Sequence, residues 1–134
     1  MRGLKILTIV IIGVGSSLAV AAGAQQVNYS GPQDFQTYCT SCHGTGAKGD
    51  GMIAKSLARK PADLTQLSKR NNGVFPEDKA FKTIEGRTPG VHGDADMPVW
   101  GDVFAKSSDS LGVESATARI SALVKYLETL QEKK

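Results

Sequence analysis

The sequence predicts an all-α domain with long loops. Its last segment places Ile120, Leu123, Val124, Leu127 and Leu130 three or four residues apart, which is the spacing of one helical face. Two earlier segments begin with helix-start signals and carry the same period. No segment stands out as a strand candidate, and no internal repeat is visible. We therefore expect three to four short helices and no β-sheet.

The first 24 residues predict an export signal, not a part of this domain. Arg2 and Lys5 precede an almost wholly aliphatic run, and Ala22-Gly23-Ala24 fits the small-x-small pattern of a cleavage site. The alternative is an uncleaved N-terminal anchor, because residues 6–24 carry no charge and are nearly long enough to cross a bilayer. We expect residues 25–134 to form one periplasmic domain, tethered to the inner membrane only if the anchor is retained.

Charge excludes one class of partner. Of the 16 basic residues, two lie in the predicted signal, which leaves 14 against 13 acidic residues in the predicted mature chain. A nearly neutral domain lacks the excess of positive charge that nucleic-acid binding requires, so we expect no nucleic-acid partner.

The first helix of the mature chain is expected at residues 32–42. Ser30 and Gln33 form a capping-box pattern, a hydroxyl at the N-cap followed three residues later by a glutamine. The apolar residues that follow recur at helical spacing, so they share one face. That face carries Phe35, Tyr38, Cys39 and Cys42.

Loops and shorter helices are expected to fill the middle of the chain. A glycine-rich loop, where the backbone can approach a neighbour closely, should follow at residues 44–51, and a short helical turn at 52–57. Pro76 starts the next helix and Gly86 stops it. A long loop should then lead to an apolar segment with Trp100 and Phe104, and the final helix should span residues 115–131.

The pentapeptide Cys39-Thr40-Ser41-Cys42-His43 has the C-x-x-C-H spacing of a c-type haem attachment site. On a helix both thiols lie on one face and can bind the porphyrin covalently, while His43 supplies an axial imidazole to the iron. A thioredoxin-like redox motif would need a strand before Cys39, and none is evident. A structural zinc site would need about four ligands, whereas the chain has two cysteines and two histidines, with His92 far away in sequence.

A second axial ligand should come from a later loop. Met97 is the leading candidate, because Pro98 stiffens the loop and Trp100 can shield the thioether from water. Met52 follows the attachment site too closely to reach the opposite face of the same ring. His92 is the alternative, as a second imidazole.

With the C-x-x-C-H motif, Met97-Pro98 and helices at both ends, the mature chain resembles the class I c-type cytochromes. The resemblance implies a cytochrome c fold wrapped around one covalent haem c, with the first and last helices crossing. It also implies that a proline carbonyl accepts the Nδ1 proton of the axial histidine, and Pro61 is the matching position. The positions that match the helix crossing are Gly31, Phe35, Leu123 and Tyr126.

Residues 97–104 resemble the methionine loop of small bacterial cytochromes and of cytochrome subunits that accept electrons from periplasmic dehydrogenases. The resemblance implies an electron carrier, not an enzyme, that connects redox proteins such as a periplasmic dehydrogenase and a terminal oxidase or another cytochrome. Two alternatives stay open: a tightly bound subunit of a dehydrogenase complex, and a haem protein for ligand binding or peroxidase chemistry with His92 as its distal group.

Charged residues give two further hypotheses. Arg87 and Trp100 are candidates to donate hydrogen bonds to a haem propionate. The basic residues nearest the attachment site form either a docking patch for a redox partner or an ordinary solvated surface. These are Lys48, Lys55, Arg59 and Lys60.

Overall fold

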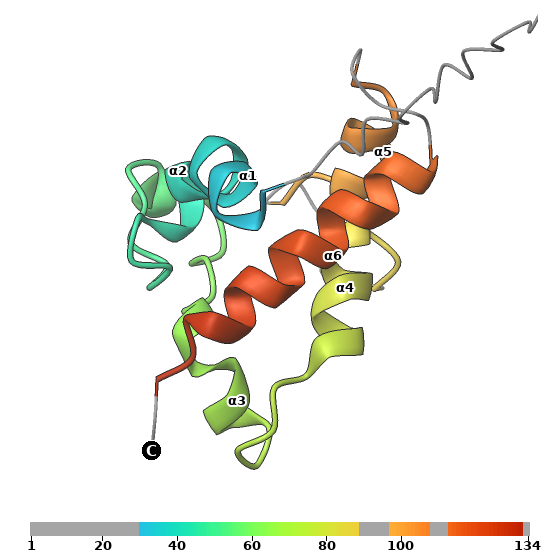
Figure 1. Ribbon diagram of the computed structural model, residues 1–134. Coiled ribbons are helices and arrows are strands. Elements are labelled where there is room, and N and C mark those ends of the chain that lie inside the picture. Colours follow the sequence, from blue (N-terminus) through green and yellow to red (C-terminus); the bar gives the residue numbers. More distant parts are fainter. Residues whose placement is uncertain (1–29, 89–96, 108–112, 133–134) are drawn as a thin grey trace, which may run out of the picture.

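The computed structural model describes residues 30–88, 97–107 and 113–132, and the side chains of residues 113 and 114 are not part of that description (Figure 1). Within these ranges the chain forms helices and no strand, which confirms the all-α prediction. The elements are α1 (Gly31–Tyr38), α2 (Thr40–His43), η1 (Ala54–Ser56), η2 (Leu64–Gln66), α3 (Leu67–Arg70), α4 (Glu77–Glu85), α5 (Trp100–Ala105) and α6 (Val113–Thr129).

The predicted helix at 32–42 is present but interrupted at Cys39. Its start is as expected, because the Gln33 amide donates a hydrogen bond of 3.4 Å to the Ser30 hydroxyl. Cys39, with φ −112° and ψ −27°, is both the C-cap of α1 and the N-cap of α2, so the chain divides into two helices there. In a continuous helix the Thr40 amide would donate to the Gln36 carbonyl. Here the Thr40 hydroxyl donates to that carbonyl, at 2.8 Å.

The central element is α6, and α1 crosses it at very close range (Figure 1). A Cβ atom on Gly31 would lie 2.1 Å from the carbonyl oxygen of Ala122, so only glycine allows this approach. The rings of Phe35 and Tyr126 pack with their centroids 5.5 Å apart. Together with Leu123, which is almost fully buried, these contacts confirm the predicted crossing of the first and last helices.

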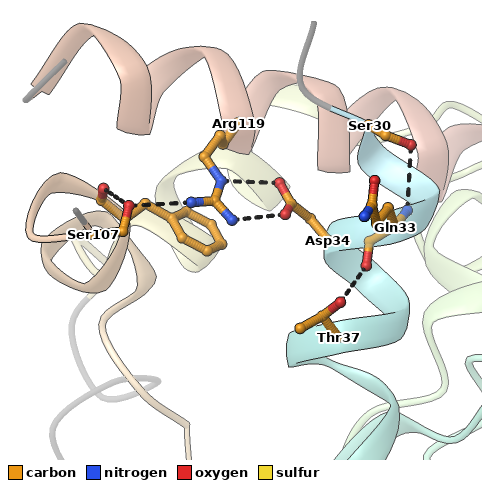
Figure 2. A network of polar contacts seen from close by, with 7 residues as sticks. Ser30, Gln33, Asp34, Thr37, Ser107 and Arg119 are labelled. Carbon is orange, nitrogen blue, oxygen red and sulfur yellow. Dashed lines mark hydrogen bonds and ion pairs between the residues drawn. The ribbon is translucent and has the colours of Figure 1, made fainter. Parts of the chain in front are cut away.

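A buried ion pair ties the same two helices together (Figure 2). The guanidinium of Arg119 donates to both carboxylate oxygens of Asp34, from Nε at 3.1 Å and from Nη2 at 2.7 Å. Arg119 is 5% exposed and Asp34 8% exposed. The hydrogen bonds to Asp34 raise the pKa of Arg119 above its ordinary value, so the arginine stays charged. Neither residue was predicted from the sequence to have a role.

Two further helices pack on α6, and both follow the sequence signals. The backbone amide of Gly86, at φ +97°, caps α4 by donating to the carbonyls of Lys82 and Thr83. The segment with Trp100 and Phe104 forms α5, whose Phe104 is 1% exposed. Residues 52–57 form only the short turn η1. Apart from Leu130, which is half-buried, the predicted stripe of α6 lies in the core, with Ile120, Leu123, Val124 and Leu127 all buried.

The helical segment η2–α3 was not predicted. Asp63 caps it, since its carboxylate accepts hydrogen bonds from the Thr65 amide at 2.9 Å and the Thr65 hydroxyl at 2.6 Å. The side chain of Gln131, just beyond α6, accepts from the Ser68 amide and donates to the Leu64 carbonyl, both at 2.8 Å. The segment is thus held by residues distant in sequence.

The N-terminal predictions concern residues that the structure does not describe. The proposed signal or anchor, residues 1–24, lies outside the described ranges. Within those ranges, none of the helices combines the length and the apolarity that a membrane crossing demands.

Replacing Gly31 with alanine should destabilise the protein. The added methyl would clash with the backbone of Ala122, and overpacking of this kind costs about 1–3 kcal/mol. The matched control is Gly46→Ala, because the nearest atom to a Cβ there is the Lys48 Cγ at 3.9 Å. Chemical denaturation of both variants would measure the difference. Equal stabilities would show that the close crossing of α1 and α6 does not exist.

Candidate functional site

A cavity of about 460 Å³ lies between α2, the segment 57–71, α4, residues 97–100 and α6. Its volume falls in the range of roughly 300–1,000 Å³ that is typical of ligand pockets. Most of its wall is apolar. The apolar and aromatic lining residues are Tyr38, Leu57, Pro61, Ala62, Leu64, Leu67, Pro76, Ala80, Ile84, Pro98, Trp100, Leu123 and Leu127.

The predicted iron ligands and attachment cysteines all line this cavity. Cys39, Cys42 and His43 do so from the α1–α2 junction and from α2, and Met97 does so from the segment that precedes α5. The C-x-x-C-H motif fixes the first three as neighbours in sequence, but only the fold brings Met97 to them. Met52 is 91% exposed and is not among the lining residues, and His92 lies outside the described residues.

The glycine-rich loop folds back onto α2. The amides of Gly49 and Gly51 donate to the carbonyls of His43 at 2.8 Å and Cys42 at 3.0 Å, so the loop satisfies the open end of the helix. A Cβ on Gly51 would lie 2.3 Å from the Ser41 carbonyl oxygen, so this packing requires glycine. The expectation of close backbone approach is confirmed.

The imidazole of His43 is oriented by a backbone carbonyl, but not by the one predicted. Its Nδ1 lies 3.0 Å from the carbonyl oxygen of Ala62, and a carbonyl can only accept, so Nδ1 carries the proton and Nε2 has the free lone pair. The prediction of Pro61 as acceptor is wrong by one residue. The Pro61 carbonyl instead faces Gly49, since a Cβ on Gly49 would lie 2.3 Å from the Pro61 carbonyl oxygen. Pro61 still lines the cavity.

Burial sets the protonation of the motif. It lowers the pKa of His43 below its ordinary value, with the hydrogen bond to Ala62 as a smaller opposing effect, so the imidazole is neutral and able to bind a metal at neutral pH. Burial, followed by the charge of Asp34 and the neighbouring Cys42, raises the pKa of Cys39 to about 12. A thioredoxin-like site needs the opposite, a thiol with a lowered pKa.

A zinc site fits these residues less well. Among the described residues, no three His, Cys, Asp or Glu side chains come together as a group able to hold a metal ion. A structural zinc ion would need about four ligands of this kind.

The segment that carries Met97 is fixed against α4 by two close approaches. A Cβ on Gly86 would lie 2.5 Å from the Cγ1 atom of Val99, so Val99 packs directly against this glycine. A Cβ on Gly101 would lie 2.7 Å from the Glu85 carbonyl oxygen. Met97 is half-buried and packs against the hydrophobic core. The wall beside it is an aromatic cluster, which we define as Tyr38, Trp100 and Phe104, with ring centroids 5.4–5.7 Å apart.

The charged residues of the cavity differ from those predicted. The side chain of Arg87 is 74% exposed, forms an ion pair of 3.0 Å with Glu85 and is not among the lining residues, so its role as a propionate contact stays a prediction. A position just past the C-cap of α4 directs it outward. Trp100 does line the cavity.

Four basic residues and no acidic residue are among the lining residues: Arg59, Lys60, Arg70 and Lys79. The first two belong to the basic group noted in the sequence. Lys79 and Thr83 lie one turn apart on α4, and both line the cavity. They directly precede Ala80 and Ile84 in the chain, so helical spacing could have identified Lys79 from the sequence. Arg70 had no such signal, because α3 itself was not predicted. Lys48 instead forms an exposed ion pair with Glu132 at 3.8 Å.

Comparison with known proteins adds no relative. No family model matches the chain, and no match was found among curated protein sequences or among solved structures.

The cap at Asp63 should stabilise the segment that holds the Ala62 carbonyl against His43. Asp63→Ala should lower the free energy of unfolding by about 1 kcal/mol at neutral pH, the usual effect of losing such a cap. The hydrogen bond from the Thr65 side chain is the main reason that the pKa of Asp63 lies below its ordinary 3.8. The folded state thus favours the ionised form, so this contribution is present above pH 3.8 and is lost as the pH falls through the lowered pKa.

Denaturant unfolding of the wild type and Asp63→Ala from neutral pH to about pH 3 measures this. The stability difference should shrink on acidification. Asp63→Asn is the control, because its amide oxygen still accepts the Thr65 amide but does not titrate. A difference between wild type and Asp63→Ala that stays constant at all pH values would contradict the assignment.

Proposed function

We propose that this protein is an electron carrier with one covalently bound c-type haem in the cavity described above. The observation that carries the proposal is the convergence of Cys39, Cys42, His43 and Met97 on a single, mostly apolar cavity. Two thiols, an imidazole and a thioether are the donor set of a His/Met-ligated haem c.

The residues fit the group in three respects. The two cysteine side chains would attach it through thioether bonds to its vinyl groups. His43 would hold the iron through Nε2, because its Nδ1 proton is already given to Ala62. Met97 would take the other axial position. Once bound, the haem iron supplies one-electron redox chemistry.

The finer fold that we propose is the cytochrome c fold. Its support is the crossing of α1 and α6 through Gly31, Phe35 and Tyr126, with the cavity against one face of α6. Most of the cavity wall is apolar, so a haem there would be removed from water and would supply much of the core of a small domain.

Electrostatics favour a cofactor with negative groups. Four cations and no carboxylate line the cavity, which suits two haem propionates better than a cationic or neutral ligand. Arg59, Lys60, Arg70 and Lys79 are therefore the propionate candidates, together with the Trp100 indole, which lines the same space.

With both axial positions filled by the protein, the iron would have no open site for a substrate, so we propose an electron carrier and not an enzyme. Its partners would be other redox proteins: a periplasmic dehydrogenase as donor, and a terminal oxidase or another cytochrome as acceptor. We propose a periplasmic location, reached through residues 1–24, with attachment to the inner membrane if that segment is retained.

A second candidate is a subunit that stays bound to a dehydrogenase. The exposed apolar side chains of Met52 and Ile53, 91% and 42% exposed, are the candidate contacts of such a subunit. Gel filtration of protein purified from its own host separates the two: a monomer supports the free carrier, and a larger complex supports the subunit.

The axial assignment can be tested on protein matured by export. The pyridine haemochrome should give one haem per chain, and the ferric protein should show the weak far-red absorption band of thioether ligation. Met97→Ala should abolish that band and allow carbon monoxide to bind the ferrous protein. Met97→His should keep six-coordination but lower the reduction potential, since a thioether raises it.

The matched control is Met52→Ala, which removes an exposed methionine and should leave the band unchanged. A colourless wild type would reject the haem. A band that survives Met97→Ala would reject Met97 as ligand. Fast and complete binding of carbon monoxide by the wild type would support ligand-binding or peroxidase chemistry instead.

A further inference from the structure

The buried ion pair of Arg119 and Asp34 contains none of the proposed haem ligands, yet it lies next to two of them in the fold. Asp34 is on α1, one turn and one residue before Cys39, and its charge contributes to the raised pKa of that thiol. Arg119 is on α6, behind the aromatic cluster that forms the cavity wall beside Met97. A buried charge is costly unless it is paired and hydrogen-bonded, so the contacts of Arg119 are informative.

Two contacts of Arg119 are made to α5 and to Ser107, the second residue after α5. Its Nη1 donates to the hydroxyl of Ser107 at 3.3 Å, as Figure 2 shows, and that hydroxyl donates to the Phe104 carbonyl at 2.9 Å. The Arg119 Cζ lies 4.2 Å from the centroid of the Phe104 ring, within the distance at which a cation is attracted to an aromatic face. The fork toward Asp34 fixes the plane of the guanidinium for both contacts.

The aromatic cluster connects this contact to the cavity. Phe104 stacks on Trp100, with centroids 5.7 Å apart and planes at 30°, and it meets the edge of Tyr38 at 5.4 Å. Tyr38 and Trp100 both line the cavity with Met97. Met97 precedes Trp100, the first residue of α5, by three residues, so the position of α5 limits where the Met97 backbone can lie.

A helix as short as α5, six residues, is not stable by itself and must be held at both ends. Its N-terminal side is held by the contacts of Val99 with Gly86 and of Gly101 with Glu85. Its C-terminal side is held by Arg119, through Ser107 and Phe104.

We propose that Arg119 is a positioning residue for Met97: oriented by Asp34, it fixes α5 so that Trp100 keeps the thioether at the cavity wall. This inference rests on the proposed function. It predicts that substitution of Arg119 releases the methionine from the iron before the protein unfolds. If Arg119 only stabilised the fold, methionine ligation and folding would be lost together.

The test uses the haem-loaded protein and the variants Arg119→Lys, Arg119→Gln and Ser107→Ala. Lysine keeps the charge but cannot contact Asp34, Ser107 and the ring at once. On heating, we will compare the temperature at which the far-red band is lost with the unfolding midpoint measured by circular dichroism. We expect the interval between the two to be larger in these variants than in the wild type. Carbon monoxide should bind the ferrous variants about tenfold faster, the size of coupling usual within one contact network. Ser107→Ala should shift both measurements in the same direction by less.

Tyr126→Leu is the matched control, because it weakens the packing of α1 on α6 through Phe35 and leaves Arg119, Ser107 and the aromatic cluster unchanged. It should lower the unfolding midpoint but leave the interval between band loss and unfolding, and the rate of carbon monoxide binding, close to wild type. If Arg119→Gln does not accumulate, Arg119→Lys and Ser107→Ala decide the matter.

The proposal is overturned if Arg119→Lys and Ser107→Ala keep the wild-type interval and the wild-type rate of carbon monoxide binding. It is also overturned if Tyr126→Leu shifts both as strongly as the Arg119 variants do. A wild type without haem or without the far-red band would instead refute the proposed function, so the two failures can be told apart.

Discussion

The close crossing of α1 over α6 is the contact on which the rest of the structure depends. At Gly31 the backbones approach to a distance that excludes a side chain, and the fork between Asp34 and Arg119 fixes how the two helices are rotated against each other. Cys39 ends α1, so this contact decides which way the C-x-x-C-H motif faces. A buried ion pair contributes little net stability, but it is specific in geometry, which is what such an anchor needs.

The orientation of the motif is completed by backbone groups. The glycine-rich loop returns to α2 and satisfies its last carbonyls, and the following segment places the Ala62 carbonyl against Nδ1 of His43. Asp63, next in the chain, caps η2 and so holds this segment in place. Burial therefore keeps the imidazole neutral, and a single hydrogen bond orients it without a charged partner.

The charges of the described part are divided between two environments. The ion pair behind the aromatic cluster is internally neutral and dry, whereas the cavity collects four cations with no carboxylate among its lining residues. All four of these side chains are exposed to solvent, which screens their charge. The structural ion pair is therefore kept apart from the cations at the cavity.

Local signals in the sequence determined most of the helices and the attachment motif. The cap at Ser30, the stop at Gly86 and the stripe of α6 depend on neighbours within a few residues, as do Cys39, Cys42 and His43 at fixed spacing. Met97 could be predicted as a ligand from its neighbours Pro98 and Trp100, but its position in the fold could not.

Tertiary structure decided the features that depend on distant partners. The α3 segment is held by Gln131, the hydrogen-bond acceptor for His43 is Ala62 and not Pro61, and Arg119 meets Asp34 across two helices. Each of these is a choice between nearly equivalent local options, which only packing against another part of the chain resolves.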